Sequence, residues 1–435
     1  MSAAIVASVT GPSDASGFLP HPLRARVMAE LHARPFTPVP TPGRVLRFAF
    51  MASGEAAIEA VAALGGLCAA RGLPAPPTDA RHFAVELDFA RLRFERHAEF
   101  LTYTWRFPTG AEPFVPTAEV LGRAMRLVPQ PGPLIAAIDL HIVPRDGASD
   151  LEAIFAGTPL AVSDIGEGQA RVATDFRADV DGFLRILVED RGLSPAGTGA
   201  LVQRLLEMET YRTLALLGLP EAQALAPMLD QTGADLSALM GEVQSNHGID
   251  ANRTLLERLT SLAARIERLA ADSAFRFGAT RAYHDLVEAR IATLGERPVG
   301  PHTTLGAFLS RRLMPAIRTC AAVEARQADL SKKLARFADL LRTRVDIDLE
   351  SQNALQLRRM SERLRLQLRL QQTVEGLSVA AITYYVASVL HLIFEGLHAG
   401  GLHFDATIAT AMVVPIVAIT VAALVWRIRS RHPAD

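Results

Sequence analysis

The sequence predicts an α+β domain with an antiparallel sheet, then a helical bundle with one very long stalk helix, and finally a C-terminal transmembrane hairpin of two helices. Three observations lead to this fold class. Apolar residues alternate with polar ones in short segments between residues 44 and 190. Helical spacing replaces this alternation after Pro195, and two nearly uncharged stretches follow near the C-terminus.

Strands are predicted where apolar residues recur at every second position. The segment "HFAVELDF" (82–89) places Phe83, Val85, Leu87 and Phe89 on one face. An Ala-rich helix is expected at 55–71 and a short amphipathic helix at 22–34. The other strand candidates are 44–51, 91–107, 134–143, 168–177 and 181–190, the last two as an antiparallel pair.

Helices are predicted from Gly199 onward. The first stops at Gly218 and Pro220, and others are expected at 221–243, 251–272 and 275–295. From Thr304 one helical pattern continues toward the C-terminus, with a kink expected at Pro315. Its apolar residues step by three and four and form a seam for partner helices; they are Leu330, Leu334, Phe337, Leu341, Val345 and Leu349.

Two segments have the length and composition of membrane spans, 376–394 and 406–426. Arginines flank the pair on its outer ends, whereas the loop between the spans has no Lys or Arg. The positive-inside rule therefore places both termini in the cytoplasm. The predicted boundaries are 1–193 for the α+β domain, 194–300 for the helical layer, 301–375 for the stalk, 376–394 and 406–426 for the spans, 395–405 for the external loop and 427–435 for a basic tail.

Composition argues against several function classes. A formal net charge of −1 gives no reason to expect a nucleic-acid partner. Cys68 and Cys320 lack metal-ligand spacing and are expected to be buried thiols. The sequence has no P-loop, no dinucleotide fingerprint after a strand, and no H-E-x-x-H or G-x-S-x-G motif, so we expect no enzyme.

Longer motifs carry a resemblance to a known family. They include "RLRFERHAEFLTYTW", "TDFRADVDGFLRILVED", "LVQRLLEMETYRTLALLGLP" and "LQLRLQQTVEGLSVAAITYY". Together they are similar to a bacterial family of uncharacterised membrane-anchored proteins, described only as a domain of unknown function. The resemblance covers nearly the whole chain and implies a multi-pass protein of the bacterial inner membrane.

The order of elements also resembles that of CorA-type magnesium transporters. In those proteins identical stalk helices assemble around a pore, and the first span lines it. A Gly-Met-Asn signature follows that span in the transporters, and here the corresponding stretch is "FEGLHAGGLHF" without it. The resemblance implies a homo-oligomer that handles a cation, with no indication of which ion.

One helix face that crosses the expected membrane boundary is polar. With Ile382 as the one apolar member, its residues recur at steps of three and four and could line a water-filled path; the polar ones are Gln367, Gln371, Glu375, Ser378, Tyr385 and Ser388. A ring of Glu375 at the inner mouth would attract cations. Alternatively, the serines bond back to their own helix, Tyr385 lies at helix contacts, and Glu375 lies at the headgroup level.

Three groups of side chains are candidate ligands for a divalent cation. They are Asp346 and Glu350 on the stalk; Glu395, His398, His403 and Asp405 in the external loop; and Glu95, His97 and Glu99 in an E-x-H-x-E triplet. Each has a plainer interpretation: pairing with arginines on the stalk, ordinary loop polarity, and the solvated face of a half-buried sheet. No cofactor other than such a cation is predicted.

Two functions are consistent with these features. The first is an oligomeric membrane protein that passes or senses a cation. The second is a membrane-anchored scaffold or sensor, whose hairpin is only an anchor and whose cytoplasmic part binds an unidentified protein. The expected partners are membrane lipid and further copies of the chain.

Overall fold

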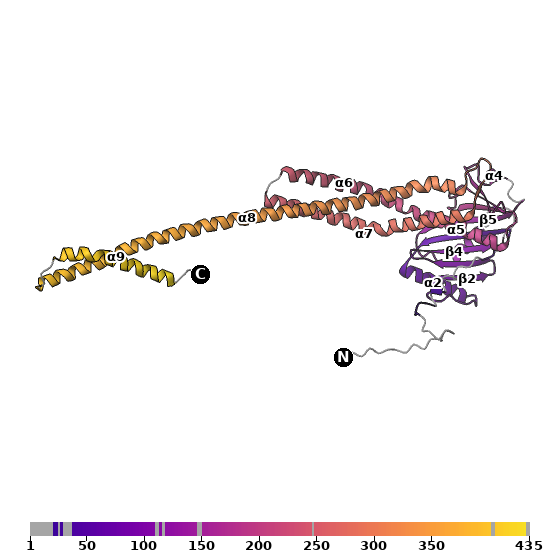
Figure 1. Cartoon of the computed structure of the whole chain (residues 1–435). Coiled ribbons are helices and arrows are strands. Elements are labelled where there is room, and N and C mark those ends of the chain that lie inside the picture. Colours follow the sequence, from indigo (N-terminus) through magenta and orange to yellow (C-terminus); the bar gives the residue numbers. More distant parts are fainter. Residues whose placement is uncertain are drawn as a thin grey trace. The chain divides into compact units, whose positions relative to one another are not determined.

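The computed structural model describes residues 21–24, 27–28, 37–108, 113–114, 118–145, 150–245, 248–401 and 405–431. The chain divides into two compact units. The first comprises Met1–Ala238 and Thr260–Ala335, and the second comprises Leu239–Leu259 and Arg336–Asp435. Figure 1 labels the elements of both units along the chain.

The described residues of the first unit form a nine-stranded sheet in the order β2-β3-β4-β1-β5-β8-β7-β6-β9. The strands are β1 (Gly43–Met51), β2 (His82–Leu87), β3 (Ala90–Arg96), β4 (Phe100–Phe107), β5 (Leu134–Pro144), β6 (Ala161–Ile165), β7 (Ala170–Thr174), β8 (Leu184–Asp190) and β9 (Arg297–Pro298). The expected strands, including the antiparallel pairing of β7 with β8, are confirmed, except that the segment 91–107 forms two strands, β3 and β4.

The sheet is mostly antiparallel, as expected, with one parallel pair. β5 pairs with β8 in parallel, whereas the other strand pairs are antiparallel, so the sheet is mixed. A parallel pair needs a long crossover connection. Here α4 (Leu151–Ile154) and the β6–β7 hairpin lie between the two strands in sequence and provide that crossover. Alternation alone predicts strands but not the direction in which they pair.

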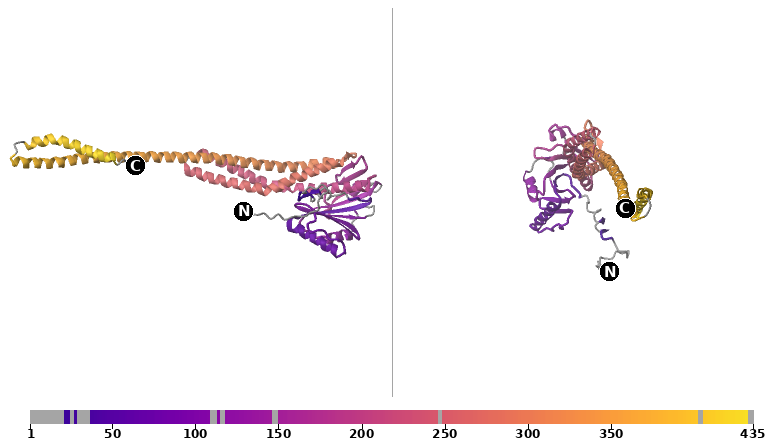
Figure 2. Two further views of the ribbon diagram at one scale, coloured as in Figure 1. Left: turned by 60° about the horizontal axis from the view of Figure 1, so that its bottom comes forward. Right: turned by 90° about the vertical axis from the view of Figure 1, so that its left-hand side faces the viewer.

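Both faces of the sheet bury apolar side chains. One face packs Leu46, Phe94 and Trp105 against α2 (Gly54–Ala69). The other packs Ile138 and Leu140 against α5 (Pro195–Leu216) and the sheet-proximal parts of two further helices. Figure 2 shows the helices lying against the sheet in this unit. The sequence-predicted helix at 55–71 is therefore confirmed as α2, whereas most of the one at 22–34 lies outside the described residues.

The remaining helices are α3 (Ala118–Leu127), α6 (Gly218–Ser245), α7 (Ile249–Leu294), α8 (Leu305–Ala399) and α9 (Ala406–Arg431). α5 begins at a Ser194 cap, whose hydroxyl accepts from the Gly197 N–H at 3.1 Å, and it ends just before Gly218 as expected. The two helices expected at 251–272 and 275–295 are instead the single helix α7. Ser273 at the expected break donates its hydroxyl to the Leu269 carbonyl at 2.8 Å and so stays within the helix.

The apolar seam of α8 packs within its own chain. In the first unit Leu330 and Leu334 are buried, and Leu330 lies beside Gly233 of α6. In the second unit Leu341 and Val345 are buried, and Arg344 donates to the Val243 carbonyl of α6 at 3.0 Å. α6 of the same chain therefore supplies a partner for this part of the seam, whereas Leu349 at its end is exposed.

The second unit ends in two helices that are long and apolar enough to cross a membrane, as judged by length and composition. In the most apolar stretch of α8 and in that of α9, none of the residues is buried inside the protein. The two helices run alongside each other in both views (Figures 1 and 2), and the His391 ring lies 2.9 Å from the Thr410 hydroxyl.

Candidate functional site

The polar line on α8 is open to the surroundings along most of its length. Gln367, Gln371, Ser378 and Tyr385 are exposed, while Ser388 is half-buried. Glu375 is also half-buried. Steps of three and four keep these residues on one side of the helix. Their role in lining a path remains a prediction.

α9 contacts α8 on a different side from Gln371 and Ser378. α8 contacts α9 through His391, whose ring meets Thr410. Because a helix turns about 100° per residue, His391 lies roughly 140° around the helix from Ser378. The half-buried neighbours Ala387, Leu390 and Phe394 lie on the same side as His391. Gln367, Gln371, Ser378 and Tyr385 therefore lie on the side of α8 away from α9, whereas Ser388 lies only about 60° from His391.

Ser378 follows the plainer of its two interpretations. Its hydroxyl donates to the Val374 carbonyl at 2.8 Å, as serines in apolar helices commonly do. Tyr385 is 70 % exposed and meets Tyr384 edge-on, with ring centroids 5.8 Å apart. The amides of Gln367 and Gln371 are thus the side chains of the line with the clearest capacity to meet water or an ion.

The acidic residues of the stalk are only partly engaged. Asp348 accepts from the Asn252 amide at 2.8 Å, which ties α8 to α7 within the second unit. Asp346 and Glu350 are exposed, and no hydrogen bond or ion pair to them is found among the described residues. Arg342, one of their expected partners, lies 3.7 Å from Asp339 instead. Cation binding at Asp346 and Glu350 stays a prediction.

Two residues of the predicted external loop have structural partners. Asp405 accepts from the Thr407 N–H at 2.8 Å and so caps the first turn of α9. These backbone donors hold the pKa of the Asp405 carboxyl below its ordinary value. Glu395 lies 3.5 Å from His391 on the preceding turn. His403 lies outside the described residues, and metal binding by His398 and its neighbours is untested.

The three side chains of the E-x-H-x-E triplet contact different partners and do not converge on one point. Glu95 binds Arg47 at 3.1 Å and Arg93 at 2.8 Å. Glu99 binds Arg276 of α7 at 2.7 Å, and the His97 ring stacks on Phe100 with centroids 4.1 Å apart. Across the residues that the structure describes, no group of three His, Cys, Asp or Glu side chains is placed to hold a metal ion.

The interpretation of this strand face as solvated is also wrong. Glu95 and Glu99 are buried, as is Arg47, because α5 and α7 cover the face. Burial raises the pKa of the Glu95 carboxyl, but the His82 ring and the Arg47 and Arg93 charges outweigh it and hold that pKa below its ordinary value. Glu95 is therefore a buried carboxylate anion that pairs with Arg47 and Arg93.

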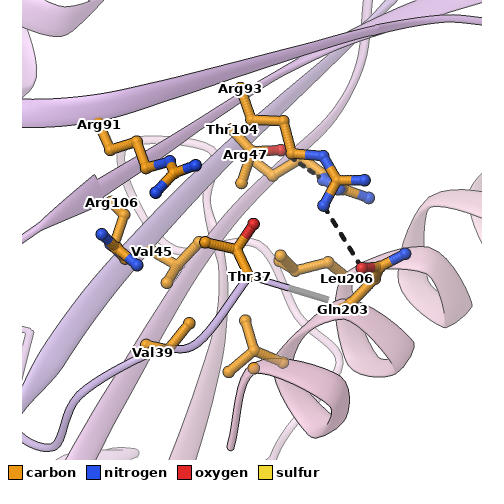
Figure 3. Close-up of a pocket in the computed structure, with 12 residues that line it drawn as sticks. Thr37, Val39, Val45, Arg47, Arg91, Arg93, Thr104, Arg106, Gln203 and Leu206 are labelled. Atoms are coloured by element: carbon orange, nitrogen blue, oxygen red, sulfur yellow. Dashed lines mark hydrogen bonds between the residues drawn. The ribbon is translucent and has the colours of Figure 1, made fainter. Parts of the chain in front are cut away.

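Sequence reasoning missed a pocket on this same face, shown in Figure 3. Four arginines line it: Arg47 on β1, Arg91 and Arg93 on β3, and Arg106 on β4. Strand register brings them together, since Arg91 pairs with Arg106 and both Arg93 and Arg47 lie opposite Thr104. The alternation of β3 already placed Arg91, Arg93 and Glu95 on one face, but only the strand order adds Arg47 and Arg106.

Comparison with known proteins gives a family and no activity. No curated protein matches the chain. The profile of a family described as "Protein of unknown function (DUF3422)" matches residues 19–432, which is nearly the whole chain. This agrees with the resemblance expected from the motifs, and the chain belongs to that family of unknown function.

Proposed function

We propose that the protein is an integral membrane protein whose copies assemble around the polar line of α8 and pass or sense a cation. The proposal begins from apolar surface in the second unit. Within the described segments 376–394 and 406–426, nine aliphatic side chains are at least half exposed: Leu377, Val389, Leu392, Ile393, Ile408, Met412, Ile416, Ile419 and Leu424. Leaving them in water would cost on the order of 10 kcal/mol, which rivals the whole stability of a domain. Lipid removes that cost.

Self-association is supported by the segment of α8 that precedes the apolar window. Leu357, Met360, Leu364 and Leu368 form one exposed stripe, and Leu355, Leu366, Leu370 and Leu377 form another on the far side of the helix. A dimer of parallel helices would cover one stripe and leave the other in water. Two neighbours for each helix would cover both stripes, and the first stripe lies on the same side of α8 as Gln371 and Glu375.

The polarity of the exposed line favours a cation. Gln367 and Gln371 offer amide oxygen atoms on the side away from α9. Between Gln367 and Ser378 the arginine of the sequence, Arg369, falls on the opposite side of the helix, whereas Arg363 lies one turn before Gln367 on the same side. This separation of Arg369 from the line is the observation that carries the proposal, because a path lined by guanidinium groups would repel cations.

The direct test is cation flux into proteoliposomes that contain the full chain. We expect flux in the wild type and its loss or marked change when Gln371→Ala is combined with Glu375→Ala. Gln372→Ala is a matched control, since it removes the same amide one residue along and about 100° around the helix. Absence of flux for every monovalent and divalent cation, or a monomer in detergent, would contradict the proposal.

Orientation is part of the proposal. Arginines on both outer flanks and none in the intervening loop place both termini in the cytoplasm of a bacterial inner membrane. Labelling of single introduced cysteines tests this: a cysteine at Gly400 is expected to react with an impermeant maleimide from outside intact spheroplasts, whereas one at Ser351 is not.

A second possible function, a membrane-anchored sensor or scaffold, is supported by the division of the chain into two units. Both candidate spans belong to the second unit, whereas the sheet and its arginine-lined pocket belong to the first. A sensor or scaffold would need only an anchor. Replacing residues 376–426 by an unrelated two-span anchor separates the two functions, because retained cellular function after the exchange would favour the scaffold.

A further inference from the structure

We propose that the arginine-lined pocket of the sheet domain binds a small oxyanion of the phosphate type. The pocket lies between the polar half of the sheet and α5, and Figure 3 shows the arginine side chains gathered at it. This inference does not depend on the proposed ion path, which lies in the other unit.

The first argument is the charge balance. Glu95 neutralises part of the charge of Arg47 and Arg93, and Glu86 lies 3.0 Å from Arg91. Among the described residues, the four guanidinium groups thus form ion pairs with two carboxylates, Glu95 and Glu86. Glu86 is 64 % exposed, so water screens it and weakens its contribution. A dianion would neutralise the two remaining positive charges.

The second argument is hydrogen-bonding capacity. Each guanidinium carries five N–H donors in a planar fork that suits phosphate oxygens. Arg91 uses one nitrogen on Glu86, and Arg106 uses one on the Pro38 carbonyl at 2.6 Å. Arg93 reaches the Gln203 amide oxygen only at 3.4 Å. Several donors therefore remain for an anion.

The third argument is that the pocket is enclosed on two sides, by apolar side chains and by the segment that precedes β1. Val45, Val202 and Leu206 give it an apolar side, which strengthens a charge-assisted bond made there. The segment at Thr37 and Pro38 closes another side against α5. It can do so because position 199 is glycine: a Cβ there would collide with the Thr37 carbonyl oxygen.

Size limits the ligand. The cavity measures about 60 Å³, far below the several hundred Å³ of sites that engulf a cofactor. It holds a few water molecules or one compact oxyanion. A larger molecule would enter only by its phosphate group, with the remainder outside the pocket.

The test is calorimetric titration of inorganic phosphate into the full chain in detergent, with thermal unfolding followed in parallel. We expect saturable binding and a phosphate-dependent rise in Tm. Arg91→Gln and Arg106→Gln should each weaken binding about ten- to a hundredfold, because each removes a charge-assisted donor. Arg177→Gln is the matched control, an exposed arginine of the same domain outside the pocket.

Two further measurements make the result decisive. Arg91→Lys keeps the positive charge but loses the planar set of guanidinium donors, so it should bind phosphate more weakly than wild type. This variant provides the test if Arg91→Gln does not fold. Tighter binding of adenosine monophosphate than of phosphate would support the pocket and assign the anion to a nucleotide. No heat and no shift in Tm with millimolar phosphate, or equal binding by wild type and Arg91→Lys, would overturn the proposal.

Discussion

Removing the buried carboxylate of Glu95 should strongly destabilise the sheet domain. Glu95 is 4 % exposed and binds both Arg47 and Arg93. The substitution Glu95→Gln keeps the shape of the side chain but leaves Arg47, itself 4 % exposed, without its counter-charge. Breaking a buried pair in this way costs about 3–5 kcal/mol.

A matched variant on the same face isolates the effect of burial. Glu86→Gln also removes one carboxylate that lies beside an arginine, but the Glu86 side chain is 64 % exposed. An exposed pair contributes at most about 1 kcal/mol. We therefore expect the loss in Glu95→Gln to exceed that in Glu86→Gln at least threefold.

The chain supplies its own reporter for this measurement. It contains two tryptophans, Trp105 and Trp426, and Trp105 is fully buried in β4. In a Trp426→Phe background, fluorescence during urea unfolding in detergent reports the sheet alone. The free energy of unfolding of each variant is then compared in that background.

The pH dependence gives a second check. The folded-state pKa of Glu95 lies below its ordinary value of 4.5. The stabilisation by its carboxylate is therefore complete at pH 7 and lost as the pH falls below 4.5 toward the folded-state pKa. The gap between wild type and Glu95→Gln should shrink by about 1.4 kcal/mol per pH unit in that range. A loss no larger than in Glu86→Gln, or a gap that is constant from pH 7 to pH 3, would refute the reasoning.

Three further outcomes are expected. Gly218→Ala should lower stability by about 1–3 kcal/mol in thermal melts, because its Cβ would collide with the Thr280 hydroxyl; an unchanged Tm would contradict that packing. Asp405→Ala should lower stability through loss of a helix cap while Asp405→Asn keeps it, as circular dichroism during unfolding would show. Burial raises the pKa of the Cys68 and Cys320 thiols, so neither should react with iodoacetamide at pH 8 before unfolding, and rapid labelling of the folded chain would count against this.

Much of the fold could be predicted from periodicity. Alternation located β1 and β3, and helical spacing located α5 and the continuous course of α8, because each pattern reflects one side buried against a neighbour. The direction of the β5–β8 pairing could not be predicted in this way. It depends on the path of the chain through α4 and the β6–β7 hairpin, whose local patterns are compatible with either direction.

The candidate sites were harder to predict. The alternation of β3 showed that Arg91, Arg93 and Glu95 share a face, but it also suggested that this face is solvated. Whether a polar face is covered depends on helices far along the chain, here α5 and α7. Arg47 joins the group only because β1 lies beside β4, which the sequence alone does not reveal.

One face of the sheet therefore has two halves with different roles. Around β5 and β8 it is apolar, with Ile138 and Ile186 packed under helices, and burial there stabilises the fold. Around β3 and β4 the same face carries four arginines and too few carboxylates. Replacing buried ion pairs by apolar side chains is often neutral or stabilising, so stability alone does not account for that half. The proposed bound anion accounts for the arginine-rich half, because the positive charge that is not neutralised by carboxylates would then attract the anion.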